Sequence, residues 1–122
     1  MKNPDPLEKV IEAAVCKYAQ SKGCLVYKFT SPSRSAVCDR IFMCRGKVWF
    51  IEFKRGGEKA TPAQSRHHQE LVRHDITVYV VDSINMGKEI VDYETQQTTS
   101  GHHWSAIRYI SCGSTITRKE HP

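Results

Sequence analysis

The sequence has no long apolar run. None of its segments approaches the roughly 18 consecutive apolar residues that a membrane-spanning helix needs. The N-terminal stretch MKNPDPLEKV also lacks the apolar core of a signal peptide. These absences predict a cytoplasmic protein that does not associate with membranes.

Cysteine occurs in an odd number and without metal-binding spacing. No two of the five cysteines form a Cys-x-x-Cys pair, so the sequence indicates neither a disulfide framework nor a zinc site. We expect buried free thiols instead. The cysteines are Cys16, Cys24, Cys38, Cys44 and Cys112.

Acidic residues are outnumbered by basic ones. The 122 residues carry 18 lysines and arginines against 13 aspartates and glutamates, which gives a formal net charge of +5. This length is enough for one apolar core. The excess of positive charge favours a polyanionic partner such as nucleic acid.

Two segments have the start signals of a helix. Asp5-Pro6-Leu7-Glu8 and Thr61-Pro62-Ala63-Gln64 each combine an N-cap acceptor, a proline at the first helical position and an acid or amide at the third. We predict helices over 6–22, closed by Gly23, and over 62–74. The first helix should bury the stripe Leu7, Val10, Ile11, Ala14, Val15 and Tyr18.

Short β-branched and aromatic segments predict the strands. They cover residues 24–29, 39–44, 47–54 and 76–81. The order of helix, three strands, helix and strand predicts a small α/β sheet covered by helices. Beyond residue 83, residues 86–93 fit a short helix and residues 106–110 an edge strand.

The second and third strands bring two acids together. Side chains alternate along a strand, so Glu52 and Lys54 share one face. A two-residue or four-residue loop around 45–46 places Asp39 opposite Glu52 in antiparallel register, whereas a three-residue loop would break this pairing. We therefore predict that Asp39 and Glu52 are neighbours.

Two opposed carboxylates destabilise a sheet unless something offsets their charge. Magnesium is bound by one or two carboxylates together with phosphate oxygens and water, so Asp39 and Glu52 could hold a Mg²⁺ that bridges to a phosphodiester, with Mn²⁺ as a substitute. Lys54 could then position an attacking water and stabilise charge on the phosphate. The alternative is a solvated face on which Glu52 pairs with a lysine or arginine.

The first helix offers a third acid. Glu8 has a capping role, whereas Glu12, one turn further on, has no local role. Glu12 is therefore the preferred candidate, and an ordinary solvated glutamate is the alternative.

Glu12, Asp39, the triplet Glu52-Phe53-Lys54 and Gln64 follow one another on a helix, three strands and a helix. This set resembles the PD-(D/E)xK nuclease superfamily and, within it, the virus-type replication-repair nuclease (VRR-NUC) family in its small stand-alone phage and bacterial form. The resemblance implies a restriction-endonuclease-like α/β core with a mixed central sheet, similar to Holliday junction resolvases.

The resemblance also implies a division of the chain and of its roles. Residues 1–83 would form the nuclease core, and residues 84–122 would be a C-terminal extension of the same domain. Asp39 and Glu52 would bind the metal with help from the Phe53 carbonyl, and Lys54 would serve the hydrolytic water. The implied catalytic set is Glu12, the helix acid, with Asp39, Glu52, Lys54 and the accessory Gln64.

The implied activity is divalent-metal-dependent cleavage of branched DNA by a homodimer, in the cytoplasm of a bacterial cell or a phage-infected host. A symmetric junction needs two cuts related by a two-fold axis, which a dimer supplies. Two alternatives stay open: an inert nucleic-acid-binding module, and a restriction-type nuclease that reads a sequence through residues 84–122.

One stretch departs from the family pattern. Family members usually have a glycine and then a proline before the aspartate, whereas this chain reads Ala36-Val37-Cys38-Asp39. Proline supplies no ligand, so metal binding should survive its absence. The departure concerns the conformation of the loop that leads into Asp39.

Basic residues gather near the expected acid pair, on one edge of the predicted sheet. Phosphate contacts by such residues are independent of base sequence and weaken with salt. The predicted DNA contacts are Arg34, Arg40, Arg55, Lys59 and Arg66. Adjacent histidines on a helix point about 100° apart, so His67, His68, His74 and the pair at 102–103 are interpreted as surface residues.

Overall fold

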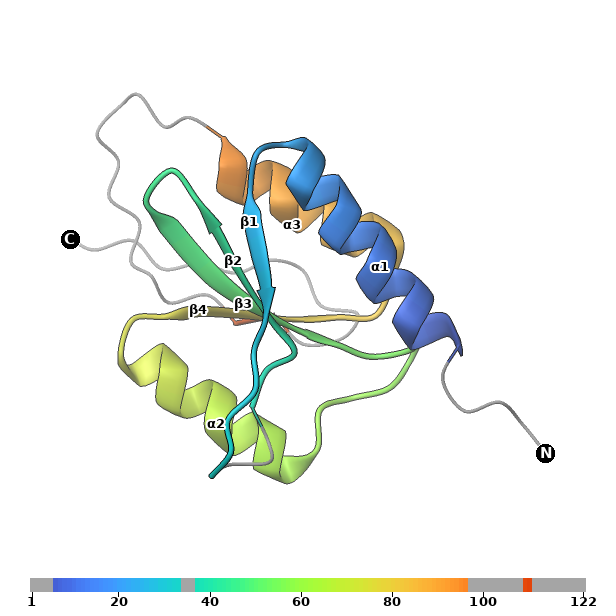
Figure 1. Ribbon diagram of the computed structural model, residues 1–122. Coiled ribbons are helices and arrows are strands. Elements are labelled where there is room, and N and C mark those ends of the chain that lie inside the picture. Colours follow the sequence, from blue (N-terminus) through green and yellow to red (C-terminus); the bar gives the residue numbers. More distant parts are fainter. Residues whose placement is uncertain (1–5, 34–36, 97–108, 111–122) are drawn as a thin grey trace.

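The chain forms a mixed five-stranded sheet with helices on both faces (Figure 1). The computed structural model describes residues 6–33, 37–96 and 109–110. The first three strands are antiparallel to their neighbours. The fourth strand pairs with the third in parallel, and the fifth pairs with the fourth in parallel. The helices are α1 (Pro6–Ser21), α2 (Pro62–Arg73) and α3 (Ile84–Thr95). The strands are β1 (Leu25–Lys28), β2 (Arg40–Cys44), β3 (Lys47–Phe53), β4 (Thr77–Val81) and β5 (Tyr109–Ile110). The predicted α/β architecture with a mixed sheet is confirmed.

The helix ends follow the sequence signals. Gly23 adopts φ +91°, the amide of Gly23 donates to the carbonyl of Gln20, and the amide of Cys24 donates to that of Ala19, which is the Schellman arrangement. Thr61 caps α2 through a complete capping box with Gln64. The expected cap of α1, Asp5, lies outside the described residues.

Alternation along β3 divides the core between the two faces of the sheet. Trp49, Ile51 and Phe53 pack with α1 and α3 on one face, while Phe50 packs on the other against residues of α2 such as Leu71. Figure 1 shows α1 and α3 together on one side of the sheet and α2 on the opposite side. Glu52, like Phe50, therefore belongs to the α2 face.

The buried stripe of α1 is shorter than predicted. Ile11, Val15 and Ala19 are buried at intervals of four residues, whereas Leu7 and Val10 are 58% and 52% exposed. Leu7 continues the same series, but it stands one turn before the packed part of the helix. Val10 lies to the side of the series, so its predicted burial was wrong for a different reason.

After β4 the structure contains a helix and a strand close to the positions predicted for them. The short helix expected over 86–93 is the longer α3, which begins at the N-cap Ser83. Of the predicted edge strand over 106–110, Tyr109–Ile110 forms β5 beside β4, and the remainder lies outside the described residues. Within the described ranges, no helix combines the length and the apolar character needed to cross a membrane.

The two helices on the same face approach each other closely at Gly87. A Cβ at this position would stand 2.3 Å from a methyl carbon of Val15, which is fully buried. A β-branched side chain on a helix has one strongly preferred rotamer, so Val15 cannot readily turn away. The missing side chain at position 87 therefore sets the separation of α1 and α3.

Gly87→Ala should destabilise the protein. Alanine gains about 1 kcal/mol over glycine in a helix, but overpacking a core costs about 1–3 kcal/mol, and the contact with Val15 makes the second effect larger. Urea unfolding measures the difference. The loss should disappear in a Val15→Ala background, and Gly56→Ala is the control, because its Cβ would come no nearer than 4.0 Å to the Asp82 carbonyl oxygen. A more stable Gly87→Ala protein would contradict the close helix crossing.

Candidate functional site

The β2–β3 hairpin has the register that the sequence predicted. Arg45 and Gly46 have φ values of +51° and +85°, as a two-residue hairpin loop requires. Arg40 lies opposite Ile51, so one further step in the same register places Asp39 opposite Glu52. The charge of Glu52 also acts on Asp39, so the prediction that these two acids are neighbours is confirmed.

Glu52 is buried and Asp39 is half-buried. Burial, and after it the charge of Glu52, raises the pKa of Asp39 to about 6. Burial also raises the pKa of Glu52 to about 7, against the opposing charge of Lys54. The Phe53 amide donates a hydrogen bond to Asp39 Oδ2 at 2.8 Å and so holds one carboxylate in place. The pair is poised to gain from a nearby cation, because a cation favours the ionised forms that burial disfavours.

Gln64 connects the start of α2 to this pair. Its side-chain Oε1 accepts from the Thr61 amide at 2.9 Å, and its Nε2 donates to Glu52 Oε2 at 3.0 Å. The capping box thus orients the amide so that its NH₂ group faces the carboxylate. The sequence pattern that starts the helix also positions a side chain in the candidate site.

The histidines of α2 correct the sequence prediction. His67 and His68 are 9% and 0% exposed, so their interpretation as surface residues was wrong, whereas His74 is exposed as expected. The Nε2 atom of His68 lies 3.6 Å from Glu52 Oε1. Burial, and then the charge of Lys54, lowers the pKa of His68 to about 4, which keeps its imidazole neutral at neutral pH. The pair at 102–103 lies outside the described residues.

Two lysines act electrostatically on the acids. Lys54 is half-buried at the end of β3 and lowers the pKa of Glu52. Lys28 at the end of β1 lowers the pKa of Asp39. Of these two lysines only Lys54 could be predicted from the sequence, because the position of Lys28 follows from the pairing of β1 with β2 and not from a motif.

Glu12 is bound to a residue predicted to contact DNA. The Arg40 guanidinium donates to Glu12 Oε2 at 2.6 Å, and both side chains are largely shielded from solvent. Glu12 still raises the pKa of Asp39, and both Glu8 and Glu12 raise that of Glu52, with Glu8 the stronger of the two. Both helix acids therefore lie within electrostatic range of the pair.

The other predicted DNA contacts are on the surface or outside the described residues. Lys59 and Arg66 are exposed, and Arg55 forms a 3.9 Å ion pair with Glu58. Arg34 lies outside the described residues. Lys59 and Arg66 flank the start of α2, next to the residue that binds Glu52.

The residues present fit a divalent cation. Glu52 Oε1 is buried and accepts no hydrogen bond within the described part of the chain. A buried carboxylate oxygen without a donor is costly unless a ligand supplies the missing interaction. Carboxylate oxygens are the donors that magnesium prefers. Asp39 and Glu52 therefore offer the right chemistry.

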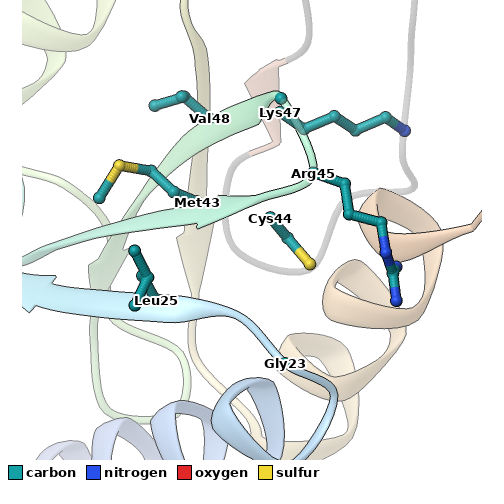
Figure 2. A pocket seen from close by; sticks show the side chains of 8 residues that line it. Gly23, Leu25, Met43, Cys44, Arg45, Lys47 and Val48 are labelled. Atoms are coloured by element: carbon teal, nitrogen blue, oxygen red, sulfur yellow. The ribbon is translucent and has the colours of Figure 1, made fainter.

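A separate hollow of about 430 Å³ lies at the turn end of the hairpin (Figure 2). Leu25, Met43 and Val48 line it from neighbouring positions on three strands, together with Arg45 and Lys47 from the turn. None of the described residues that line it is acidic. Because β2 runs from the acid pair to this turn, the hollow and the candidate site occupy opposite ends of the hairpin.

Known proteins resemble the chain in sequence and in fold. It is 41% identical over 80 residues to the "Putative nuclease p44" of Acyrthosiphon pisum secondary endosymbiont phage 1, and the match covers 65% of this chain and 82% of the relative. A solved structure described as a VRR_NUC domain matches with a TM-score of 0.66 at 26% identity, over 70% of this chain and 95% of the other. No protein-family model matches the chain.

The raised pKa values of Asp39 and Glu52 predict a loss of stability as the pH rises in the absence of divalent cations. A carboxyl group with a raised folded pKa binds its proton more tightly when folded, so the free energy of unfolding falls as the pH rises toward that pKa. For Glu52 this interval runs from 4.5 to about 7. The lowered pKa of His68 acts in the opposite direction between about 4 and 6.5, so the Glu52 contribution is clearest above that interval.

From about pH 6.5 to about pH 8 in EDTA, the unfolding free energy of the wild type should fall by roughly 1 kcal/mol more than that of Glu52→Gln. Urea unfolding of both proteins at the two pH values measures this difference. Added Mg²⁺ should reduce it, because a cation bound only to the folded state stabilises that state. Equal changes in the two proteins would mean that Glu52 is already ionised at the lower pH.

Proposed function

Because the chain belongs to the VRR-NUC family of nucleases, we propose that it is a divalent-metal-dependent DNA endonuclease that hydrolyses phosphodiester bonds. The observation that carries this proposal is the pair of adjacent carboxylates, the half-buried Asp39 and the buried Glu52, at the end of the β2–β3 hairpin. The net charge of +5 supports a polyanionic substrate.

In this proposal Asp39, Glu52 and the carbonyl of Phe53 would hold a magnesium ion. When bound, the ion would supply Lewis-acid chemistry toward the phosphate and the attacking water. Lys54 orients the attacking water and stabilises the negative charge that develops on the phosphate. Its half-buried position beside Glu52 supports this role.

Gln64 and Glu12 act beside this centre. The hydrogen bond from Gln64 fixes one oxygen of Glu52, so Gln64 is a positioning residue. Glu12 is the acid of the first helix, and its tight contact with Arg40 makes Arg40 a link between α1 and β2. An incoming phosphate would compete with Glu12 for that guanidinium, which favours Glu12 and Arg40 as groups that respond to bound DNA.

We propose branched DNA, including Holliday junctions, as the preferred substrate in bacterial or phage replication, recombination or repair. The relative from a phage supports that setting. Arg40, Arg55, Lys59 and Arg66, together with Arg34 outside the described residues, would contact phosphates without reading the base sequence. The enzyme would act as a homodimer, because two symmetric cuts need two sites.

Cleavage of four-way junctions, flaps and linear duplex, with Mg²⁺, Mn²⁺ or EDTA, tests the activity. Asp39→Asn and Lys54→Ala should each reduce metal-dependent cleavage by about 100-fold or more and leave DNA affinity largely unchanged. Asp75→Asn and Lys47→Ala are matched controls, because the first is exposed and the second lies at the turn end of β3.

The two alternatives give different results in the same assay. DNA binding without metal-dependent cleavage would favour an inert binding module. Cleavage of linear duplex at one sequence would favour a restriction-type nuclease. Preferential cleavage of junctions, lost in both site variants and kept in both controls, supports the proposal.

The dimer is tested by mass and by a mixed complex. Sedimentation equilibrium should give twice the 13.9 kDa mass of one chain at cleavage concentrations. Dimers that combine one wild-type and one Asp39→Asn subunit should nick a junction in one strand only, since each site cuts one strand. Paired cuts by a protein of monomer mass would contradict the homodimer.

A further inference from the structure

Three different metal-binding side chains meet on the α2 face of the sheet, next to the acid pair. Cys38 comes from the loop before β2, Glu52 from β3 and His68 from α2. One donor atom of each lies within 4.8 Å of the other two, and all three residues are buried. We infer that they form a second cation site, for a thiol-binding divalent transition metal such as Zn²⁺, which competes with magnesium for Glu52.

The donor types distinguish this site from the Asp39–Glu52 pair. A thiolate sulfur and an imidazole nitrogen are preferred by zinc and similar transition metals, whereas magnesium prefers oxygen donors. Cys38 stands immediately before Asp39 in the chain, so a soft donor lies next to the proposed magnesium site. Zinc sites with three protein ligands and a water in the fourth position are common.

The distances are close to those of a tetrahedral site. Donor atoms at about 2.0–2.3 Å from a zinc ion lie roughly 3.3–3.8 Å from one another. His68 Nε2 and Glu52 Oε1 are already 3.6 Å apart. Because the Cys38 sulfur lies within 4.8 Å of one donor atom of each of these residues, a shift of roughly 1 Å would complete the site.

The surroundings also suit a metal. Glu52 Oε1 is buried and lacks a hydrogen bond among the described residues, so it has a lone pair to offer. The lowered pKa of His68 keeps its imidazole in the neutral, ligating form. Burial raises the pKa of the Cys38 thiol above its usual range, so the metal must displace the thiol proton, which is released to solvent.

Glu52 belongs both to the acid pair and to the cluster with Cys38 and His68, so a metal bound at one of these sites should affect the other. One of its oxygens, Oε2, accepts from Gln64, while Oε1 lies toward His68. A transition metal bound to Cys38, His68 and Oε1 would neutralise Glu52 and hold its carboxylate toward α2. Binding of Zn²⁺ should therefore weaken magnesium at Asp39 and Glu52 and inhibit cleavage, a step that rests on the proposed function.

Binding itself can be tested without any nuclease assay. Co²⁺ is titrated into the reduced, full-length, metal-free protein, and the thiolate-to-cobalt charge-transfer absorption is recorded. The wild type should bind one equivalent with this absorption, and one equivalent of Zn²⁺ should abolish it. Absence of the thiolate absorption in the wild type would overturn the inference.

Variants locate the site. Cys38→Ala and His68→Asn should weaken cobalt binding at least tenfold, and circular dichroism verifies that each variant is folded, with Cys38→Ser as a second variant if Cys38→Ala is not. Asp39→Asn and Cys16→Ala should keep the absorption, since one removes the acid outside the cluster and the other a buried thiol elsewhere. An unchanged absorption in Cys38→Ala would overturn the inference.

Competition is then tested as a ratio within each protein. At fixed Mg²⁺, Zn²⁺ at the concentration that displaces Co²⁺ should slow wild-type cleavage at least tenfold, while Cys38→Ala should show less than a twofold change relative to its own rate without Zn²⁺. Equal inhibition of both proteins would overturn the competition. If no cleavage occurs with Mg²⁺ alone, the proposed function fails, whereas the cobalt titration still decides the site.

Discussion

The site depends on two carboxylates that lie side by side, one of them buried and the other half-buried. Such a pair is unfavourable by itself, because burial disfavours each charge and each charge disfavours the other. The fold maintains it through the fixed register of the β2–β3 hairpin and through donors supplied by neighbours. The Phe53 amide binds Asp39, and the Gln64 amide binds Glu52. These two donors offset only part of the free-energy cost of placing the carboxylates together, and a bound cation can offset the rest.

The N-terminus of α2 both starts the helix and stabilises the charge of Glu52. Gln64 completes a capping box with Thr61, and the same amide group contacts Glu52. One turn later, His68 lies against the other oxygen of that carboxylate. The helix therefore covers the sheet with polar side chains where it passes the acids and with apolar ones, such as Leu71, where it passes Phe50.

The parts of the site that the sequence could predict are those set by short-range rules. A two-residue turn and strand alternation are enough to bring Asp39 to Glu52, and a capping pattern is enough to begin α2 at Pro62. The contact of Glu12 with Arg40 could not be predicted in this way, because it depends on how α1 lies against the sheet.

The burial of His68 could have been predicted from the helical spacing of the residues around it. Gln64, His68, Leu71 and Val72 recur at helical spacing, so one face of α2 leads from the acid pair into the apolar cluster. Leu7 shows the reverse error. It has the right spacing for burial, but periodicity does not reveal where along a helix the packing partner ends.

The position of α3 bears on what can fold as a unit. Ile90 and Val91 belong to the same apolar cluster as Val15 and Trp49, and Tyr79 of β4 donates a buried hydrogen bond to Glu94. A fragment cut off before this helix would expose that cluster and leave a buried tyrosine hydroxyl without its acceptor. The minimal autonomous unit therefore runs at least to Thr95, and a fusion or exchange of the C-terminal segment can begin only after it.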